Sequence, residues 1–235
     1  MTRPTFAINR NENPLPVAER QKIVADPGFG KAFTDHMAVI RYTEGKGWHS
    51  AEITARKPLL LDPAAAVLHY AQEIFEGLKA YKLADGTMAM FRPDANARRF
   101  QQSARRLAMP ELPVELFVES IEKVVDIDRA WFPTVDGGSL YIRPFMFANE
   151  VFLGVRPAHE YLYLVILSPV GGYFKGGAPA VSIFVSQNYT RAAPGGTGAA
   201  KCGGNYASSL VAQAEASKHG CDQVAGGHPN EGRED

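Results

Sequence analysis

Residues 195–207 read Gly-Gly-Thr-Gly-Ala-Ala-Lys-Cys-Gly-Gly-Asn-Tyr-Ala, which places Lys201 between alanines and glycines, with Tyr206 five residues later. A lysine amine is a nucleophile where its surroundings disfavour the ammonium form, and it can then form a Schiff base with an aldehyde. Glycines have no side chain, so the backbone here can lie close to a flat, phosphorylated cofactor. The stretch predicts a lysine site for such a cofactor, with Tyr206 as a hydrogen-bond partner for the cofactor ring.

This stretch has two other interpretations. A phosphate-binding P-loop needs a serine or threonine directly after the lysine, and Cys202 stands there instead. The missing hydroxyl excludes a P-loop, because nothing in the motif would bind magnesium. An ordinary glycine-rich loop with a solvated lysine remains open from these residues alone.

Composition and charge limit the class of protein. Of the 235 residues, 46% are hydrophobic and 21% charged, as in soluble globular proteins. The 25 basic and 25 acidic residues give a net charge of zero, which argues against a nucleic-acid or anionic-membrane surface. No apolar run is long enough to span a bilayer, and the N-terminus lacks the apolar core of a signal peptide. Cys202 and Cys221 fit neither a disulfide framework nor a zinc site, and the histidines have no metal-ligand pattern. We therefore expect a cytoplasmic protein with free thiols that binds neither nucleic acid, membrane nor metal.

Strand and helix patterns alternate along the first part of the chain. Prolines and asparagines up to residue 30 predict an irregular arm with at most one helical turn. Strands are expected at 38–42, 48–55, 78–82, 87–92, 139–148 and 161–168. Helices are expected within 68–81, at 94–106 with Asp94 as N-cap, and at 114–131. This mixture places the chain in the α/β or α+β class.

Glycine and proline content divides the chain. Residues 169–180 are rich in both, as interdomain linkers are. We therefore expect a small N-terminal α/β domain at 1–168 and the start of a larger domain at 181–224. That start would hold a strand at 181–186 and a helix at 206–219 that ends at Gly220, and the polar residues 225–235 predict a disordered tail. One strand and one helix cannot cover a core of their own, so we expect the larger domain to be incomplete.

Several motifs, taken together, resemble the branched-chain amino-acid aminotransferases, which are pyridoxal-phosphate enzymes of fold type IV. The resemblance covers about residues 26–224, and its motifs occur in order along the chain. They are Phe29-Gly-Lys-Ala-Phe-Thr-Asp-His-Met37, His69-Tyr70, Phe75-Glu-Gly-Leu-Lys79, Phe91-Arg-Pro93 with Arg99, Ser139-Leu-Tyr-Ile-Arg-Pro144, Leu153-Gly-Val155 and Lys201-Cys-Gly-Gly-Asn-Tyr206.

The resemblance implies a cofactor, a reaction and a partner. It implies that Lys201 carries pyridoxal 5'-phosphate as a Schiff base, that Arg99 binds the phosphate, and that Tyr206 hydrogen-bonds the ring oxygen. The implied reaction moves an amino group between leucine, isoleucine or valine and 2-oxoglutarate, in a homodimer. From the residues alone, a solvated helix arginine is the more usual interpretation of Arg99, and Tyr206 fits a packing tyrosine equally well.

Substrate contacts are implied at further positions. Tyr141 and Arg143 alternate on a predicted strand, so both side chains leave the same face. An aromatic ring beside a guanidinium suits a pocket for a branched chain and for the distal carboxylate of glutamate. The pattern alone also fits a half-buried tyrosine beside an edge arginine. Phe29 and Phe75 resemble apolar pocket walls, although isolated phenylalanines are usually core residues.

Three more positions imply a dimer. Tyr70, Leu153 and Val155 resemble residues that reach the substrate site of the neighbouring subunit in this family. We therefore expect each site to be completed by a second copy of the chain.

The resemblance ends at Val224. In the family, a later segment provides a carboxylate for the pyridine nitrogen, and neither Glu231 nor Glu234 lies in that motif. We therefore expect a C-terminally truncated chain. Two alternatives stay open: an inactive fragment that binds a full-length subunit, and another fold type IV enzyme such as a D-amino-acid aminotransferase or an aminodeoxychorismate lyase.

Overall fold

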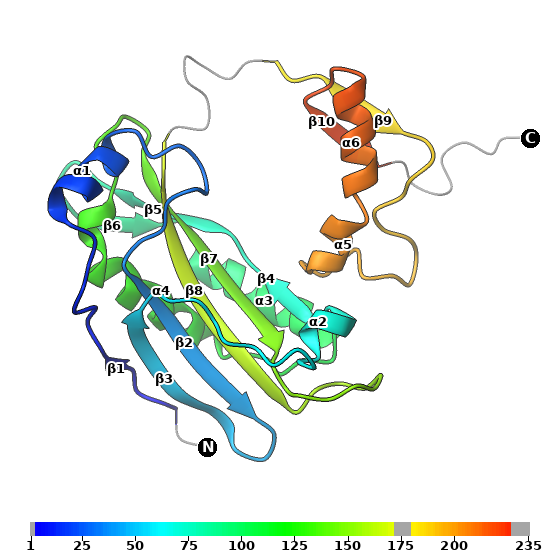
Figure 1. Ribbon diagram of the computed structural model, residues 1–235, viewed down its shortest axis with the longest axis horizontal. Helices are drawn as coiled ribbons and strands as arrows, with labels where there is room; N and C mark the ends of the chain where they lie inside the picture. Colours follow the sequence, from blue (N-terminus) through cyan, green and yellow to red (C-terminus); the bar gives the residue numbers. More distant parts are fainter. Residues whose placement is uncertain (1–2, 172–179, 227–235) are drawn as a thin grey trace, which may run out of the picture.

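The computed structural model describes residues 3–171 and 180–226. Its main feature is an eight-stranded sheet in the order β1-β3-β2-β8-β7-β5-β6, with β4 paired to β7 off this path (Figure 1). The strands are β1 (Ala7–Ile8), β2 (His36–Thr43), β3 (Gly47–Ala55), β4 (Glu73–Phe75), β5 (Leu78–Lys82), β6 (Met88–Met90), β7 (Ser139–Ala148) and β8 (Glu160–Val170). Only β1 and β3 pair in parallel within this sheet. The expected strands are confirmed, with shifted ends.

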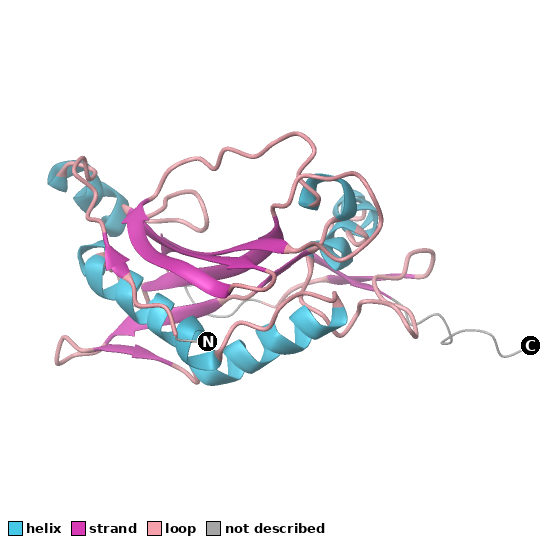
Figure 2. Cartoon of the chain, turned by 90° about the horizontal axis from the view of Figure 1, so that it is seen from below, coloured by secondary structure: helices cyan, strands magenta, loops and turns pink. Residues whose placement is uncertain are grey.

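Two long helices cover one face of the sheet (Figures 1 and 2). They are α3 (Pro93–Arg106) and α4 (Val114–Ile127). Their apolar stripes turn Phe100 and Phe117 toward Tyr163 of β8, with ring centroids 5.5 to 6.2 Å apart. The Tyr163 hydroxyl is satisfied by Ser120 at 3.0 Å. Burying these large side chains is the main stabilising contribution on this face.

The N-terminal arm is more ordered than its prolines predicted. Helix α1 (Val17–Ala25) has nine residues, where at most one turn was expected. This prediction was wrong because the prolines stop at Pro16, and residues 17–25 contain neither proline nor glycine to interrupt a helix.

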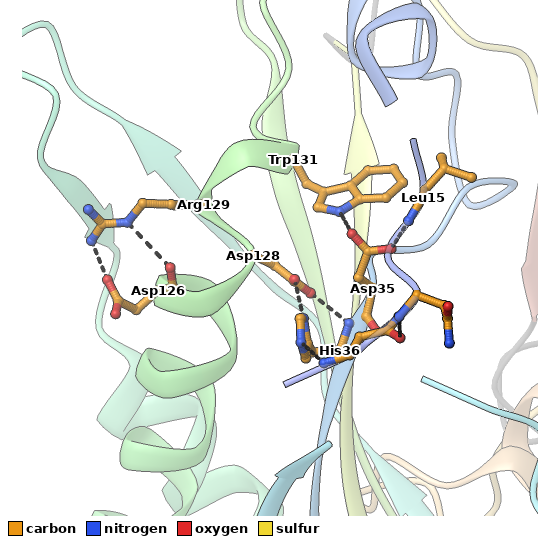
Figure 3. Close-up of polar contacts among 9 residues, drawn as sticks. Leu15, Asp35, His36, Asp126, Asp128, Arg129 and Trp131 are labelled. Carbon is orange, nitrogen blue, oxygen red and sulfur yellow. Dashed lines mark hydrogen bonds and ion pairs between the residues drawn. The ribbon is translucent and has the colours of Figure 1, made fainter. Parts of the chain in front are cut away.

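Polar contacts with the sheet hold this arm in place (Figure 3). The Asp35 carboxylate accepts the Leu15 N–H at 2.9 Å and the Trp131 ring N–H at 2.8 Å. The buried His36 ring accepts the Asn11 N–H at 2.8 Å through Nε2 and bonds Asp128 at 2.6 Å through Nδ1. These contacts give the Asp35-His36 pair of the first motif a structural role.

The helix expected within 68–81 was also wrong. Only α2 (Val67–Tyr70) forms there, and it is followed by Ala71, whose φ of 49° lies in the left-handed region. The next residues instead form β4, which pairs with β7 from Glu73 opposite Phe147 to Phe75 opposite Phe145. Pairing with a distant strand therefore outweighs the local helical spacing.

Two helix ends differ from expectation. Asp94 is not the N-cap of α3: the cap position is Arg92, and Asp94 lies in the first turn, where it pairs with Arg98 at 2.9 Å. Pro93 at the first helical position fixes this start. The second helix ends at Ile127, and a separate 3-10 turn, η1 (Arg129–Trp131), follows it.

The C-terminal part contains β9 (Ile183–Ser186), α5 (Gly203–Ala207), α6 (Leu210–Lys218) and β10 (Gln223–Gly226). Strands β9 and β10 pair in parallel, next to α6 (Figure 1). The single helix expected at 206–219 is thus two helices. Gly220 follows α6 with a φ of 72°, as expected of a glycine that ends a helix.

Two predicted segments lie largely outside the described residues. Strand β8 continues through Val170, so the first two residues of the predicted linker belong to the sheet, and 172–179 are not described. Ala225 and Gly226 of the predicted tail belong to β10, because they pair with Val185 and Ser186, and 227–235 are not described. Within the described ranges, no helix is long and apolar enough to cross a membrane.

Candidate active site

The backbone of Lys201 is held on both sides by the main sheet and its helices. The Lys201 N–H donates to the Ser103 hydroxyl of α3 at 2.9 Å, and the Lys201 carbonyl accepts the Phe75 N–H of β4 at 3.0 Å. The lysine loop is therefore docked onto the N-terminal part of the chain, although it lies far from it in sequence.

The side chain of Lys201 lies between two aromatic rings. Its Nζ donates to the Tyr206 hydroxyl at 2.5 Å and lies 4.7 Å from the ring centre of Phe75 and 4.9 Å from that of Tyr206. The two rings contact each other, with centroids 5.0 Å apart. The predicted neighbourhood of Lys201 and Tyr206 is thus present, and Phe75 belongs to the same cluster.

Arg99 is held by a buried carboxylate. Its Nε and Nη2 donate to the two oxygens of Glu76 at 2.6 and 2.7 Å. Glu76 is fully buried, whereas about half of the Arg99 side chain is exposed. Hydrogen bonding to Glu76 raises the pKa of Arg99, and the nearby Tyr206 is a smaller contributor in the same direction. Arg99 is therefore a fixed, partly solvent-facing cation near the Lys201 cluster.

Tyr141 and Arg143 leave the same face of β7, as expected. Arg143 donates to the Tyr141 hydroxyl at 2.9 Å, and its guanidinium lies 4.7 Å from the ring centre of Phe75. The Nε of Arg143 is buried and has no hydrogen-bond partner among the described residues. Phe29 lies 5.7 Å from the Tyr141 ring, with 57% of its surface exposed. The structure therefore joins Arg143, Tyr141 and Phe29 to the Lys201 cluster through Phe75.

Tyr70, Leu153 and Val155 lie elsewhere. Tyr70 stacks on Phe152 with centroids 6.3 Å apart, and 38% of its surface is exposed. Leu153 and Val155 are 71% and 94% exposed. None of the hydrogen bonds or ring contacts found among the described residues joins these three exposed side chains to Lys201.

Two acidic residues at the site were not predicted from the sequence. Glu76 was quoted within a motif but given no role, and Glu73 was not considered. Glu73 accepts the Gly203 N–H at the start of α5. Burial raises the pKa of Glu73, although this hydrogen bond and the charge of Arg143 act in the opposite direction. The sequence does contain a sign of these two residues, because Glu73 and Glu76 flank the apolar pair Ile74 and Phe75.

Asn205 was also missed, and it closes the lysine loop from inside. The residue is buried, and its amide donates to the carbonyl oxygens of Thr197 and Ala200, both at 2.8 Å. Its side-chain oxygen accepts the Thr197 hydroxyl, also at 2.8 Å. These bonds satisfy the backbone of a tight turn that has no regular secondary structure.

Comparison with known proteins gives this site a family. No protein-family model matches the chain. Over 225 residues it is 59% identical to a probable branched-chain-amino-acid aminotransferase of Streptomyces coelicolor, in an alignment that spans 95% of this chain. The chain belongs to the branched-chain-amino-acid aminotransferase family. It covers 62% of the length of that relative.

Solved structures of branched-chain aminotransferases share the fold. The Escherichia coli enzyme superposes with a TM-score of 0.65 at 26% identity, over 82% of this chain and 60% of that one. The T.th. enzyme complexed with N-(5'-phosphopyridoxyl)-L-glutamate gives a TM-score of 0.61 at 27% identity, over 80% and 58% of the two chains. The expected mixed α and β fold, fold type IV, is confirmed.

Proposed function

We propose that this chain provides the reactive lysine of a pyridoxal-phosphate-dependent aminotransferase that moves amino groups between branched-chain L-amino acids and 2-oxoglutarate. The observation that carries the proposal is the Lys201 amine, which lies between Tyr206 and Phe75 on a loop docked beside Arg99. The names of the relatives supply the substrate class. The chain spans about three fifths of the length of those relatives.

The side chains around Lys201 fit pyridoxal phosphate. Within residues 3–171 and 180–226, no ion pair joins Lys201 to a carboxylate, so its amine is available to an aldehyde. The Tyr206 hydroxyl suits the ring oxygen, and the half-exposed Arg99 suits the phosphate, because a guanidinium binds phosphate oxygens at two points. We assign these three residues to the cofactor.

The proposed chemistry needs a base near the substrate α-carbon. When bound, pyridoxal phosphate supplies an electron sink for the negative charge that forms there. A substrate amine that takes the place of Lys201 leaves the Lys201 Nζ free to accept and return a proton at that carbon. The Tyr206 hydroxyl, 2.5 Å away, orients Nζ, and the Phe75 ring packs against it with its centre 4.7 Å away.

We assign the substrate side chain to the surface made by Tyr141, Arg143, Phe29 and Phe75. The aromatic rings offer apolar contact to a branched aliphatic chain. The half-buried guanidinium of Arg143 offers a positive charge to the distal carboxylate of 2-oxoglutarate or glutamate. One site can thus accept both kinds of substrate by using different parts of the same residues.

We further propose a homodimer in which Tyr70, Leu153 and Val155 complete the partner's site. Their exposure and their separation from the Lys201 cluster support this role.

We also propose a small domain at 1–168 and a larger one that begins near 181. The free thiols Cys202 and Cys221 favour the cytoplasm.

Competition between amino acids tests the proposed reaction. The chain is mixed with pyridoxal phosphate and L-leucine or D-alanine, reduced with borohydride, and mapped by mass spectrometry. L-Leucine is expected to prevent labelling of Lys201 at an about tenfold lower concentration than D-alanine, because only its side chain fits the apolar wall. Lys201→Arg is the control that removes this label. Equal protection by the two amino acids, or stronger protection by D-alanine, would contradict the proposal.

A further inference from the structure

Three residues of α3 face the lysine loop. Arg99, Ser103 and Arg106 are spaced by four and three residues, which places them on one side of the helix. Arg99 has been assigned to the phosphate. Ser103 and Arg106 have no role in the proposed function, although both bond the loop that carries Lys201.

Ser103 links Arg99 to Lys201 directly. Its hydroxyl donates to the Arg99 carbonyl at 3.0 Å and accepts the Lys201 N–H at 2.9 Å. Because its only proton goes to Arg99, the Ser103 oxygen faces Lys201 as an acceptor. Ser103 is fully buried, so water cannot replace either bond.

Arg106 holds the start of the same loop, two turns along the helix from Arg99. Its Nη2 donates to the carbonyl oxygens of Gly195 and Gly196 at 2.8 and 3.0 Å, and its Nε donates to Gly196 at 3.2 Å. The loop is therefore fixed to α3 at its beginning and at Lys201. The bond from Phe75 to the Lys201 carbonyl prevents the residue from pivoting about Ser103.

These contacts fix the backbone of Lys201 relative to the helix that carries Arg99. A cofactor with a rigid aromatic ring holds its aldehyde and its phosphate at a nearly fixed separation. An amine and a guanidinium that bind it together must match that separation, and a displacement of about 1 Å can lower a rate by about a hundredfold. The helix face that carries Arg99 also carries the two residues that hold the backbone of the lysine loop.

We propose that Ser103 and Arg106 are positioning residues that align the Lys201 amine with a phosphate held by Arg99. The proposal rests on the proposed function. If so, losing either residue lowers the factor by which the phosphate group speeds the reaction of an aldehyde with Lys201.

Two aldehydes test this role. The full chain is treated with pyridoxal phosphate or with pyridoxal, which lacks the phosphate, and the rate of borohydride-trapped labelling at Lys201 is measured for each. The rate with pyridoxal phosphate divided by the rate with pyridoxal reports how well the Lys201 amine is aligned with the phosphate site at Arg99. Ser103→Ala and Arg106→Gln are compared with Arg105→Gln, a neighbour on the same helix that pairs with Glu111 instead of the loop. Amide hydrogen exchange at Lys201 provides a second readout without any cofactor.

The expected result is an about tenfold lower ratio in Ser103→Ala and Arg106→Gln, and an unchanged ratio in Arg105→Gln. The Lys201 amide is expected to exchange faster in Ser103→Ala, because its acceptor is lost. If Ser103→Ala fails to fold, the exposed Arg106→Gln decides the test. Suppose that the wild-type ratio is well above one. If the ratio is then unchanged in Arg106→Gln and in any folded Ser103→Ala, this inference is overturned and the proposed function is not. A wild-type chain that is not labelled at Lys201 would overturn the proposed function and this inference with it.

Discussion

The guanidinium of Arg99 lies against the fully buried carboxylate of Glu76, with two hydrogen bonds of 2.6 and 2.7 Å. Glu76 also accepts the Asn96 side-chain N–H at 2.8 Å and the Gly77 N–H at 3.2 Å. A buried carboxylate with four donors is satisfied without solvent, and it fixes the plane of the guanidinium. Arg99 is therefore oriented before any anion arrives.

Glu76→Gln is expected to destabilise the chain by about 2–3 kcal/mol. An amide has one acceptor oxygen and one donor nitrogen, so part of the four-donor cluster loses its partner. Urea unfolding measures the loss. Glu122→Gln on the exposed face of α4 is the matched control, with a change near zero. Equal stability of the two variants would show that the Glu76 cluster is not formed.

Glu73 is expected to make stability depend on pH. Burial raises its pKa above the ordinary value of 4.5, so the folded state holds this proton more tightly than the unfolded state. The stability that the proton contributes is present at low pH and is lost as pH rises from 4.5 through the raised value. Glu73→Gln removes this dependence, and its amide oxygen can still accept the Gly203 N–H.

Unfolding free energies of wild type and Glu73→Gln, measured from about pH 4 upward, test this prediction. The difference is expected to move in favour of the variant as pH rises. A difference that is constant with pH, or that moves the other way, would mean that burial does not dominate the Glu73 pKa.

Gly77→Ala is expected to displace Tyr141 from Arg143. A Cβ at this position would collide with the Tyr141 hydroxyl. The clash falls on the far end of a side chain, so a cost of about 1 kcal/mol is expected, at the low end for overpacking. Preference for L-leucine over D-alanine is expected to fall. Gly204→Ala is the control, because nothing lies within 4 Å of its added Cβ. Unchanged preference in Gly77→Ala would argue against Tyr141 as a substrate contact.

Val155→Asp is expected to weaken the proposed dimer. A charge on this 94% exposed valine would be buried in the interface without a partner, which typically costs several kcal/mol. Sedimentation velocity over a range of concentrations measures the shift toward monomer. Val17→Asp, on another exposed apolar position, is the control. The interface assignment fails if both variants sediment like wild type.

Local sequence predicted those features that depend on neighbouring residues. The five-residue spacing of Lys201 and Tyr206, with glycines between them, brings amine and hydroxyl together. Alternation along β7 places Tyr141 beside Arg143. Helix α3 was expected at 94–106 after Pro93 and forms at Pro93–Arg106, although its cap is Arg92 and not Asp94.

Contacts between distant segments could not be predicted in this way. Ser103 and Lys201 are 98 residues apart, and no spacing rule connects them. Glu76 becomes a partner of Arg99 only when β4 pairs with β7, and the apolar pattern at 68–81 favoured a helix there. The motifs quoted for the family contained Glu76, but only the folded chain gives its carboxylate a function.

The proposed function is tested most directly by identifying the lysine that carries pyridoxal phosphate. The purified chain is incubated with the cofactor, reduced with borohydride and digested, and the modified peptide is sequenced by mass spectrometry. One dominant adduct is expected on Lys201, and it is expected to be absent in Lys201→Arg. An adduct spread evenly over the other lysines, or concentrated on any one of them, would contradict it.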